Sequence, residues 1–350
     1  MSGILSGDIV TPLLYWYADS ARVLPWRTEP TPYHVWISEI MLQQTRVEAV
    51  KPYYRRFLEA LPNPAALAAV DDDALNKLWQ GLGYYSRARN LKRAACEIVE
   101  KYGGELPSSY DALRALPGIG AYTAGAIASI AFGLPEPAVD GNVLRVVSRL
   151  TADESDITKQ PTKDSVTEAL REIYPRTPDE ACAMTQALME LGATVCVPNG
   201  APHCRDCPLA DQCLAHRAGN EEDYPVKAPK KGRRIEEKTV FLLECDGHYA
   251  VRRRPEEGLL AGLWELPWAE GFLSEDEAEK HLRGMGFTVT GAPERLPDAK
   301  HIFTHIEWHM RGYRVPVSAV SEPLVSASGA EIRDSYCVPS AFRAYLACIS

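Results

Sequence analysis

One segment divides this sequence into two parts that do not share a fold. Residues 221–237 are charged, carry proline and have no apolar period, which is typical of a linker. Before this segment, apolar residues recur at helical spacing and strand-like alternation is scarce. After it, short strand-like runs are mixed with a helical segment. The sequence therefore predicts a helical region over 1–220 and a mixed α and β domain over 238–350, and 350 residues suffice for both.

The helical prediction for the first part rests on several amphipathic runs. Residues 31–61 place apolar side chains at helical spacing, and Pro52 predicts a break within them. Residues 71–83 begin with aspartates, which favour a helix N-terminus, and end in glycines, which stop a helix. The same pattern recurs over 86–104 and 164–174.

In the second part, two strand candidates flank Asp246-Gly247, which is a strong hairpin signal. These strands cover 238–245 and 248–254. The other elements predicted for this domain are a helix around 275–286 and strands over 286–291 and 301–310.

The net charge of −9 argues against a protein coated in positive charge, but it is compatible with a local DNA-binding face. The basic runs 84–93 and 227–234 are candidates, although each alone is more typical of a solvated surface. The apolar stretch 121–134 is shorter than the roughly 20 residues that span a bilayer. The first ten residues lack the features of a secretory signal. We therefore expect a cytosolic protein, and a eukaryotic nucleus stays open as an alternative.

Gly118 and Gly120 lie one residue apart in "LPGIG", directly before the small apolar run "AYTAGAIASIA". Glycine permits a positive φ and a close approach of another backbone, so the pattern predicts a tight turn that opens a helix. Free N–H groups at such a turn suit a phosphate. A helix–turn–helix without a ligand fits these two glycines equally well.

Four of the nine cysteines are clustered, with the spacing C-x7-C-x2-C-x5-C. In a cytosolic chain such a cluster indicates metal ligation rather than disulfides. Zinc sites usually contain two close cysteine pairs, and this cluster has one, so a [4Fe–4S] cluster, one per chain, is the better interpretation. The predicted ligands are Cys196, Cys204, Cys207 and Cys213.

Together these motifs resemble a known family. "LPGIGAYTAGAI", "VDGNVLRVVSRL" and the four cysteines resemble the helix-hairpin-helix DNA glycosylases related to endonuclease III. "SEIMLQQTRV", "GLGYYSRARNL" and the additional C-terminal domain bring the match closer to the MutY family, which removes adenine mispaired with 8-oxoguanine. The resemblance runs from about Leu24 to the C-terminus. It implies an all-α helix-hairpin-helix glycosylase fold, with the hairpin at 111–132 and an iron–sulfur loop at 196–213.

Cleavage of an N-glycosidic bond requires a proton for the leaving base and a negative charge near the developing sugar cation. Glu39 lies on or beside the apolar face of its helix, where burial raises a carboxyl pKa, although a glutamate at such an edge commonly reaches water. Asp140 precedes a helix, where it is a good N-cap and where N–H groups favour its ionised form. The resemblance implies that Glu39 is the catalytic acid and Asp140 the stabiliser, with Asn142 orienting these groups.

Tyr122 follows the glycine turn. In relatives that also cleave the DNA backbone, the resemblance places a lysine here that forms a Schiff base with the sugar. A phenol cannot form one. Tyr122 therefore predicts a monofunctional glycosylase, one that releases the base and leaves the strand intact.

A base inside a duplex must be flipped out before it can be cut. The resemblance implies that Tyr84 and Gln44 form a wedge on the 8-oxoguanine side, and it assigns Gly118 and Gly120 to the DNA backbone. Without the resemblance, the apolar members of the adenine pocket would be ordinary core residues. The residues implied for the adenine pocket and the adjacent "LQQT" turn are Trp26, Arg27, Leu42, Gln43, Val47 and Gln186.

Three features depart from the resemblance. The first cysteine gap has seven residues where the family has six, and we expect ligation to survive because loop length changes closure cost slowly. The C-terminal domain resembles a Nudix hydrolase fold through "GLLAGLWELPW", but the following helix lacks the paired glutamates that bind magnesium. We expect a lesion-recognition domain. The resemblance implies that Phe303, Thr304 and His305 contact 8-oxoguanine, with threonine in place of the family's serine. On pattern alone, these three residues look like part of a strand.

The sequence thus predicts a monofunctional adenine DNA glycosylase of base excision repair, acting on A opposite 8-oxoguanine or guanine in double-stranded DNA. A pyrimidine-lesion glycosylase/lyase and a non-catalytic DNA-binding protein are the alternatives. We expect a monomer without membrane association, in a bacterial cytoplasm at the nucleoid.

Overall fold

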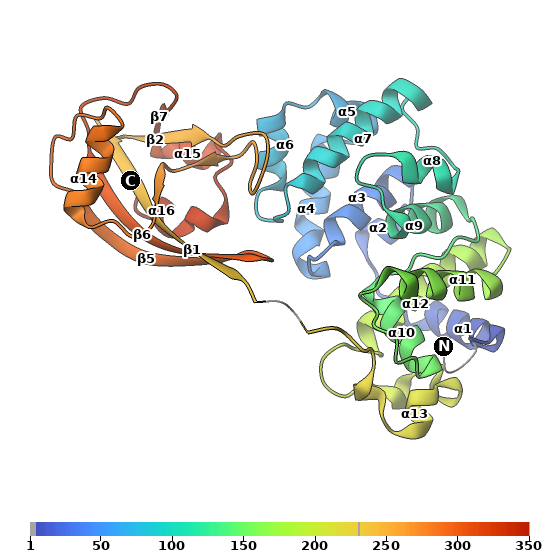
Figure 1. Cartoon of the computed structure of the whole chain (residues 1–350). Coiled ribbons are helices and arrows are strands. Elements are labelled where there is room, and N and C mark those ends of the chain that lie inside the picture. Colours follow the sequence, from blue (N-terminus) through green and yellow to red (C-terminus); the bar gives the residue numbers. More distant parts are fainter. Residues whose placement is uncertain (1–4, 230–231, 350) are drawn as a thin grey trace. The chain divides into compact units, whose positions relative to one another are not determined.

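The computed structural model describes residues 5–229 and 232–349. These residues form two compact units. Unit 1 holds residues 5–69 and 89–229, and unit 2 holds residues 70–88 and 232–349. Unit 1 is helical, whereas unit 2 is built around a sheet (Figure 1). In the described part of the chain, no helix combines the length and the apolarity needed to cross a membrane.

The helices of unit 1 reproduce the predicted amphipathic runs with one correction. The predicted break at Pro52 is wrong, because Pro52 lies inside a helix. The break comes earlier, at Gln43–Arg46, where Gln44 adopts a left-handed φ of 59°. The helices that lie wholly in unit 1 are α1 (Val10–Ser20), α2 (Pro25–Thr28), α3 (Pro32–Leu42), α4 (Val47–Ala60), α5 (Pro64–Ala69), α8 (Tyr110–Ala115), α9 (Ala121–Phe132), α10 (Gly141–Thr151), α11 (Gln160–Ile173), α12 (Pro178–Thr194) and α13 (Leu214–Ala218).

The predicted helix-hairpin-helix is formed by α8, the glycine turn and α9. Gly118 has φ of 76°, and a Cβ there would lie 2.6 Å from the Cβ of Asn90, so only glycine fits. Gly120 is the N-cap of α9. The small residues of α9 let it pack against α3 and α12, and this packing brings three helices that carry predicted site residues together.

Unit 2 contains a seven-stranded mixed sheet. Along its main path the strand order is β3-β2-β1-β6-β5, with β4 paired to β1 and β7 paired to β2. The β1–β6 pair is parallel and the other pairs are antiparallel. The strands are β1 (Arg234–Cys245), β2 (His248–Arg253), β3 (Trp264–Glu265), β4 (Trp268–Glu270), β5 (Glu294–Ile302), β6 (Ile306–Pro316) and β7 (Val325–Ser328).

Helices cover both faces of this sheet. Along β1, Val240 and Leu242 belong to one apolar cluster, and Phe241 and Leu243 belong to another. The first cluster includes residues of α15 (Gly329–Asp334) and α16 (Arg343–Leu346), and the second includes residues of α14 (Glu275–Gly284). A strand that is covered on both faces is apolar without alternation, as β1 is.

The predictions for the second part are confirmed in two places and wrong in two. The Asp246-Gly247 turn has φ values of 49° and 75°, as a tight hairpin requires, and α14 matches the predicted helix. Residues 286–291 are not a strand, because they make only the isolated bridge Val289–Val317. Residues 301–310 are not one strand, since β5 ends at Ile302 and β6 begins at Ile306.

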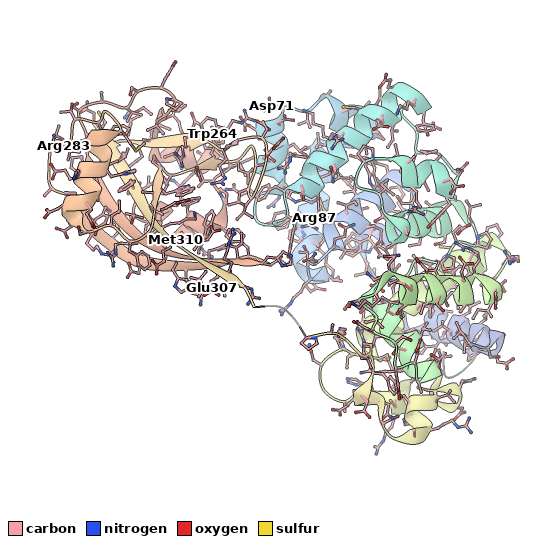
Figure 2. The ribbon with its side chains drawn as sticks, in the orientation of Figure 1. Asp71, Arg87, Trp264, Arg283, Glu307 and Met310 are labelled. Carbon is pink, nitrogen blue, oxygen red and sulfur yellow. The ribbon has the colours of Figure 1, made fainter. Side chains whose placement is uncertain are left out.

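Unit 2 also includes a segment that precedes the linker by more than a hundred residues. Helix α6 (Asp72–Trp79) and the start of α7 (Ser86–Tyr102) pack against the sheet domain, and Figure 2 labels Arg87 and Trp264 from the two segments. The Trp264 indole donates to Asp73 over 3.3 Å, and the Gln80 amide donates to the Val338 carbonyl over 3.1 Å. Part of the helical sequence therefore belongs structurally to the C-terminal domain.

Candidate active site

A cleft of about 1010 Å³ opens in unit 1 between α2, α3, α9, α10 and α12. It collects the site residues predicted for the helical region other than Tyr84 and the four cysteines, and these residues run from Trp26 to Gln186 in the sequence. The predicted residues that line it are Trp26, Arg27, Glu39, Leu42, Gln43, Gln44, Val47, Gly118, Gly120, Tyr122, Asp140, Asn142 and Gln186.

Glu39 is almost fully buried at this cleft, with 5% of its surface exposed. Helix α3 begins at the Thr31 N-cap and is buried on nearly all sides, so its one carboxyl cannot turn to solvent. The Tyr122 hydroxyl donates a hydrogen bond to it. Burial raises the pKa of Glu39 to about 7; the negative charge of Asp140 adds to this shift, while the Tyr122 bond and Arg27 oppose it. Near neutral pH this carboxyl is able to hold a proton.

Asp140 is the N-cap of α10 and shares the cleft with Glu39. Its Oδ1 accepts the backbone N–H groups of Asn142 and Val143, each over 2.8 Å. Its Oδ2 accepts the Asn142 side-chain amide over 2.8 Å. Burial raises the pKa of Asp140, and these bonds and Arg145 lower it without cancelling the shift. The predicted N–H contacts are therefore present, but they do not hold the pKa of this carboxyl at its ordinary value.

Arg145 was not singled out from the sequence, where it looks like an ordinary helical cation. It is 4% exposed and donates to the Asn142 Oδ1 over 2.8 Å and to the Gly192 carbonyl over 2.7 Å. Its Nε donates to the Cys196 carbonyl over 2.7 Å. At Gly192 a Cβ would lie 2.5 Å from the Asn142 Cβ, so α10 and α12 can approach only because this residue is glycine. The position of Asn142 is thus fixed from α12 and from the cysteine segment.

The charges of both catalytic carboxyls act on the Tyr122 phenol. Burial raises its pKa well above the ordinary value, and the charges of Glu39 and Asp140 act in the same direction. The phenol therefore stays protonated and acts as a hydrogen-bond donor. It offers no amine to a sugar carbon.

The predicted adenine pocket contains a second buried carboxyl that the sequence analysis missed. Glu190 on α12 is 1% exposed and forms ion pairs with Arg22 at 2.6 Å and with Arg27 at 2.9 Å. Burial alone would raise its pKa, but the two arginines outweigh burial and hold the pKa below its usual value. Nearby, Trp26 packs edge-on against Tyr54 with centroids 5.5 Å apart.

Both predicted wedge residues, Gln44 and Tyr84, have a left-handed backbone, with φ of 59° and 48°. Such values are uncommon outside glycine and cluster at functional sites. The neighbouring Gln43 is fixed by a bond from its amide to the Thr123 hydroxyl over 3.3 Å. Gln44 belongs to unit 1 and Tyr84 to unit 2.

Within unit 2, the Tyr84 hydroxyl lies 3.1 Å from the hydroxyl of Thr304. The Arg87 guanidinium stacks over both the Tyr84 and the Trp79 rings, 5.6 and 5.3 Å from their centroids. Arg87 also donates to the Leu82 and Gly83 carbonyls over 3.0 and 3.1 Å, which braces the turn. Two predicted site residues separated by 220 positions are therefore in direct contact.

Residues 303–305, called the reader turn below, connect β5 to β6. The strand interpretation of these residues is wrong. Phe303 is anchored against Trp308 at 4.9 Å, while Thr304 and His305 are exposed. The Arg233 side chain donates to the Phe303 carbonyl over 3.1 Å. The turn thus has an apolar anchor and two exposed side chains, of which Thr304 also contacts Tyr84.

The four predicted cysteine ligands lie close enough for the charge of one sulfur to affect the pKa of another. Burial raises the pKa of Cys204 to about 12 and that of Cys207 to about 11, and further contributions come from neighbouring cysteines. The Arg149 guanidinium donates to the Cys196 sulfur over 3.2 Å. Backbone N–H groups donate to the sulfurs of Cys207 and Cys213. N–H and guanidinium donors around sulfur favour a bound thiolate, so the donor set fits a thiolate-ligated cluster.

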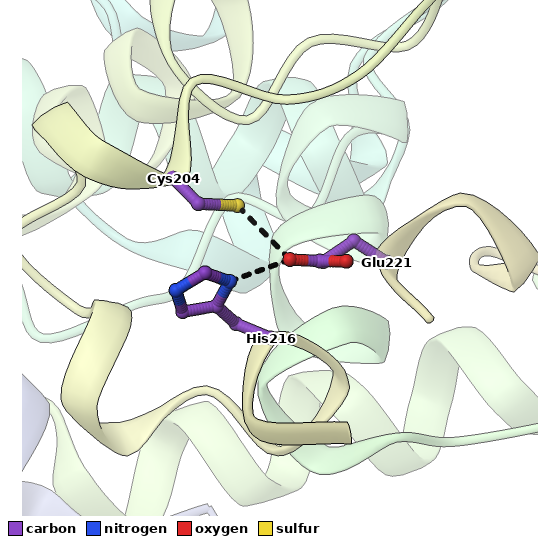
Figure 3. Close-up of side chains that lie close together, drawn as sticks. All are labelled: Cys204, His216 and Glu221. Atoms are coloured by element: carbon purple, nitrogen blue, oxygen red, sulfur yellow. Dashed lines mark hydrogen bonds and ion pairs between the residues drawn. The ribbon is translucent and has the colours of Figure 1, made fainter. Parts of the chain in front are cut away.

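Figure 3 shows a second donor set that shares Cys204. The His216 Nδ1 and the Glu221 Oε1 are 2.5 Å apart, and the Cys204 thiol donates to the same oxygen over 3.5 Å. The three donor atoms lie within 4.8 Å of one another. His216 and Glu221 match no familiar metal-binding motif in residue type or spacing, so the sequence analysis did not single them out.

Comparison with known proteins places both parts of the chain. Residues 37–176 match the HhH-GPD superfamily of base excision DNA repair proteins, and residues 239–348 match the NUDIX domain. The chain is 36% identical to adenine DNA glycosylase of Mus musculus over 354 residues, covering 84% of this chain and 68% of the relative. It is 36% identical to the enzyme of that name from Buchnera aphidicola subsp. Baizongia pistaciae, covering 88% and 86%.

Among solved structures, a trapped endonuclease III–DNA covalent intermediate is similar, with a TM-score of 0.52 and 27% identity. The similarity covers 62% of this chain and 99% of that chain. The predicted helix-hairpin-helix fold followed by a Nudix-like domain is thus confirmed. With Glu39 and Asp140 facing one cleft of that fold, the chain belongs to the adenine DNA glycosylase family of base excision repair.

Proposed function

We propose that this DNA N-glycosylase is monofunctional and excises adenine opposite 8-oxoguanine or guanine in duplex DNA. The observation that carries the proposal is the pairing of the buried Glu39 with the Tyr122 phenol at a cleft that Asp140 also lines. A proton donor and a charge stabiliser are present, and the residue beside them cannot form a Schiff base.

In this mechanism Glu39 delivers its proton to a ring nitrogen of the flipped adenine. The N-glycosidic bond breaks, its electron pair leaves with the base, and positive charge develops on the sugar. Asp140 stabilises that charge, and Asn142 holds the Asp140 carboxylate in place. Glu39, now a carboxylate, accepts a proton from the water that attacks the sugar carbon. The products are free adenine and an abasic site in an intact strand.

The pocket residues supply recognition and positioning. We infer that Trp26, Leu42 and Val47 enclose the flipped base, and that Arg27 and Gln186 contact its polar edge. The exposed turn at Gly118 and Gly120 is the proposed backbone contact, because N–H groups at the start of α9 suit a phosphate.

Opposite-base specificity must come from the partner base, because the adenine that is removed is a normal base. We infer that Gln44 and Tyr84 enter the stack, and that the reader turn contacts the lesion. 8-oxoguanine differs from guanine by a carbonyl and a ring N–H, which a hydroxyl or an imidazole can contact. The bond between Tyr84 and Thr304 supports this inference, since it couples a wedge residue to the reader turn. The resemblance implies a serine at this position, and Thr304 keeps its hydroxyl.

We further propose one [4Fe–4S] cluster, held by Cys196, Cys204, Cys207 and Cys213. When bound, such a cluster supplies iron–thiolate cross-links between the segments that carry the four ligands. The chain's own residues contribute the sulfurs and the donors around them. A monomeric protein in a bacterial cytoplasm stays a prediction.

Base-release assays test the proposed substrate and the monofunctional mechanism together. Duplexes carrying A opposite 8-oxoguanine, G, C or T are incubated with the protein, and half of each sample is treated with alkali. We expect adenine release opposite 8-oxoguanine and G, with strand cleavage only after alkali. Efficient borohydride trapping of the wild-type protein on DNA would contradict the monofunctional mechanism, and Tyr122→Lys is the matched gain-of-amine variant.

Metal and sulfide analysis tests the cluster against the second donor set. Anaerobically purified protein should contain about four irons and four sulfides per chain. Cys204→Ser should lower the iron content and weaken DNA binding, whereas His216→Ala should leave the iron content unchanged. Stoichiometric zinc without sulfide, lost in the His216→Ala variant, would assign the metal to Cys204, His216 and Glu221 instead.

A further inference from the structure

The buried carboxyl of Glu190 has no role in the mechanism above, yet it has more ionic partners than either catalytic carboxyl. Its Oε1 accepts from the Arg22 Nε over 2.6 Å and from the Arg22 backbone N–H over 3.2 Å. Its Oε2 accepts from the Arg22 Nη2 over 3.0 Å and from the Arg27 Nη2 over 2.9 Å. One carboxylate therefore fixes two guanidinium groups at the wall of the cleft.

Burying these charges costs desolvation free energy. A buried ion pair loses much of its Coulomb gain to desolvation, so it is weak evidence for a stabilising role. The glutamate, at 1% exposure, cannot be solvated instead. The two ion pairs lie at the edge of the predicted base pocket, since Glu190, Arg22 and Arg27 all line the same cleft.

Arg27 is held on three sides. Besides Glu190, it donates through Nη1 to the Arg22 carbonyl over 3.0 Å, and it lies over the Tyr17 ring at 5.5 Å. A guanidinium has five N–H donors. Its bonds to acceptors within the described residues use two nitrogens, so donors remain that can face a ligand in the cleft. The ring nitrogens of a purine are acceptors, which match such donors.

Arg27 also acts on the proton donor. Glu39 on α3 faces Tyr122 from α9, Asp140 from the turn before α10, and Arg27 from α2. Of these groups, the Arg27 charge and the Tyr122 bond lower the pKa of Glu39, and the Asp140 charge raises it. The position of the Arg27 guanidinium therefore affects both its contact with the base and the pKa of Glu39.

We propose that Glu190 is a positioning residue, which acts through Arg27 to present a guanidinium to the flipped base and to the catalytic carboxyl. This inference rests on the proposed role of Glu39. A residue that only pinned the N-terminal segment to α12 would affect stability alone. A positioning residue affects the chemical step and its pH dependence.

The test is single-turnover adenine release by Glu190→Gln, measured over pH 5.5–9 with mispair affinity and melting temperature alongside. We expect the rate to fall about 10- to 100-fold, which is the size of effect seen when outer partners of a site are removed. Mispair affinity should change less than threefold. Release of Arg27 should move the alkaline limb of the profile to higher pH, because a positive charge that lowers the Glu39 pKa has moved away.

Three further variants keep the test decisive even where Glu190→Gln lowers stability. Glu190→Asp keeps the charge and should retain more activity than Glu190→Gln. Arg27→Lys and the double variant Arg27→Lys/Glu190→Gln should be equally slow, because coupled residues are not additive. Glu97→Gln, which removes the partner of the exposed Lys101 on α7, is the matched control and should leave rate and profile unchanged.

Wild-type rate and profile in Glu190→Gln would overturn the proposal, as would a double variant slower by the product of the two single effects. A loss matched by lower melting temperature, with the alkaline limb unmoved, would also overturn it. Glu39→Gln measured in the same series separates this outcome from failure of the mechanism. Near-normal excision by Glu39→Gln would show that Glu39 is not the proton donor. Normal excision by Glu190→Gln would show only that Glu190 is not a positioning residue.

Discussion

The cleft of unit 1 and the reader turn of unit 2 place polar groups by opposite means. In the cleft, Glu39 is buried and Asp140 is half-buried, and desolvation raises the pKa of both. In unit 2, Thr304 and His305 are exposed on a turn, and Tyr84 is 45% exposed with a left-handed backbone. The first region uses desolvation to set a protonation state, and the second uses backbone geometry to present hydroxyl groups.

This difference predicts how each region fails. A buried titratable group controls a rate and depends on pH, because its charge state is part of the chemistry. An exposed hydroxyl contributes a hydrogen bond whose net worth is about 0.5–1.5 kcal/mol and which does not titrate near neutral pH. Changes in the cleft should therefore reduce excision of every substrate, whereas changes at the reader turn should alter the preference among substrates.

The largest expected effect is that of Glu39→Gln. Glutamine keeps the shape and the contact with Tyr122 but cannot deliver a proton, so single-turnover excision should fall by about 10²–10⁴-fold. Binding to a mispair should be largely retained, as measured by fluorescence anisotropy. Glu97→Gln, outside the cleft, serves as the control. Near-normal excision by Glu39→Gln would show that the cleft does not act through this carboxyl.

The sequence was sufficient to predict the cleft residues because each carried a motif. Glu39, Tyr122 and Asp140 lie in or beside runs that resemble the family closely, and all three line one cavity. Glu190 and Arg145 were missed because a charged residue on a helix usually reaches solvent, and only tertiary packing shows that these two are buried.

The sequence was less informative about unit 2. Alternation predicted one strand across residues 301–310, but a hairpin turn interrupts it, and no turn residue such as glycine marks the position. Unit 2 combines residues 70–88, which include α6, with residues 232–349 of the sheet domain. Residues 89–229, which lie between these segments in the sequence, belong to unit 1. Local pattern carries no information on such long-range contacts.

The second effect concerns stability, and it follows from the same buried group. Burial raises the pKa of Glu39 from 4.5 to about 7, so the folded protein binds this proton more tightly than the unfolded chain does. The resulting stabilisation is complete below pH 4.5 and is lost as the pH rises through 7. At pH 8.5, Glu39→Gln should therefore be more stable than the wild type by up to about 3 kcal/mol.

Urea unfolding at pH 5.5 and pH 8.5 measures this difference. The gain in Glu39→Gln should be less than half as large at the lower pH as at the higher pH. The excision rate of the wild type should fall over the same interval, because the donor loses its proton. Equal stability of the two proteins at both pH values would show that Glu39 is not desolvated in solution.

The third effect separates the cap from the chemistry at Asp140. Asparagine is as good an N-cap as aspartate, whereas alanine is not, and loss of a cap costs about 0.5–2 kcal/mol. The free energy of unfolding of Asp140→Asn should therefore lie within a few tenths of a kcal/mol of the wild-type value, the difference coming from the lost interaction of the charge with the helix dipole. This variant should nevertheless excise adenine slowly. Asp140→Ala should be slow and also less stable. Normal excision by Asp140→Asn would leave Asp140 as a cap alone.

The smallest effect belongs to the reader turn, and it distinguishes the two regions most directly. Tyr84→Phe and Thr304→Ala each remove one partner of a 3.1 Å hydroxyl contact, and Thr304→Ser keeps it as the control. If the contact orders both residues on the lesion, the preference for A opposite 8-oxoguanine over A opposite G should fall by about 1 kcal/mol in each single variant. The double variant should lose little more than either single variant, since the two hydroxyls share one bond. The excision rate on A opposite G should stay within about twofold of the wild type, because the catalytic carboxyls of unit 1 are untouched. Additive losses in the double variant would mean that Tyr84 and Thr304 contact the lesion independently, and an equal loss on both substrates would place the hydroxyls in the chemistry of the cleft.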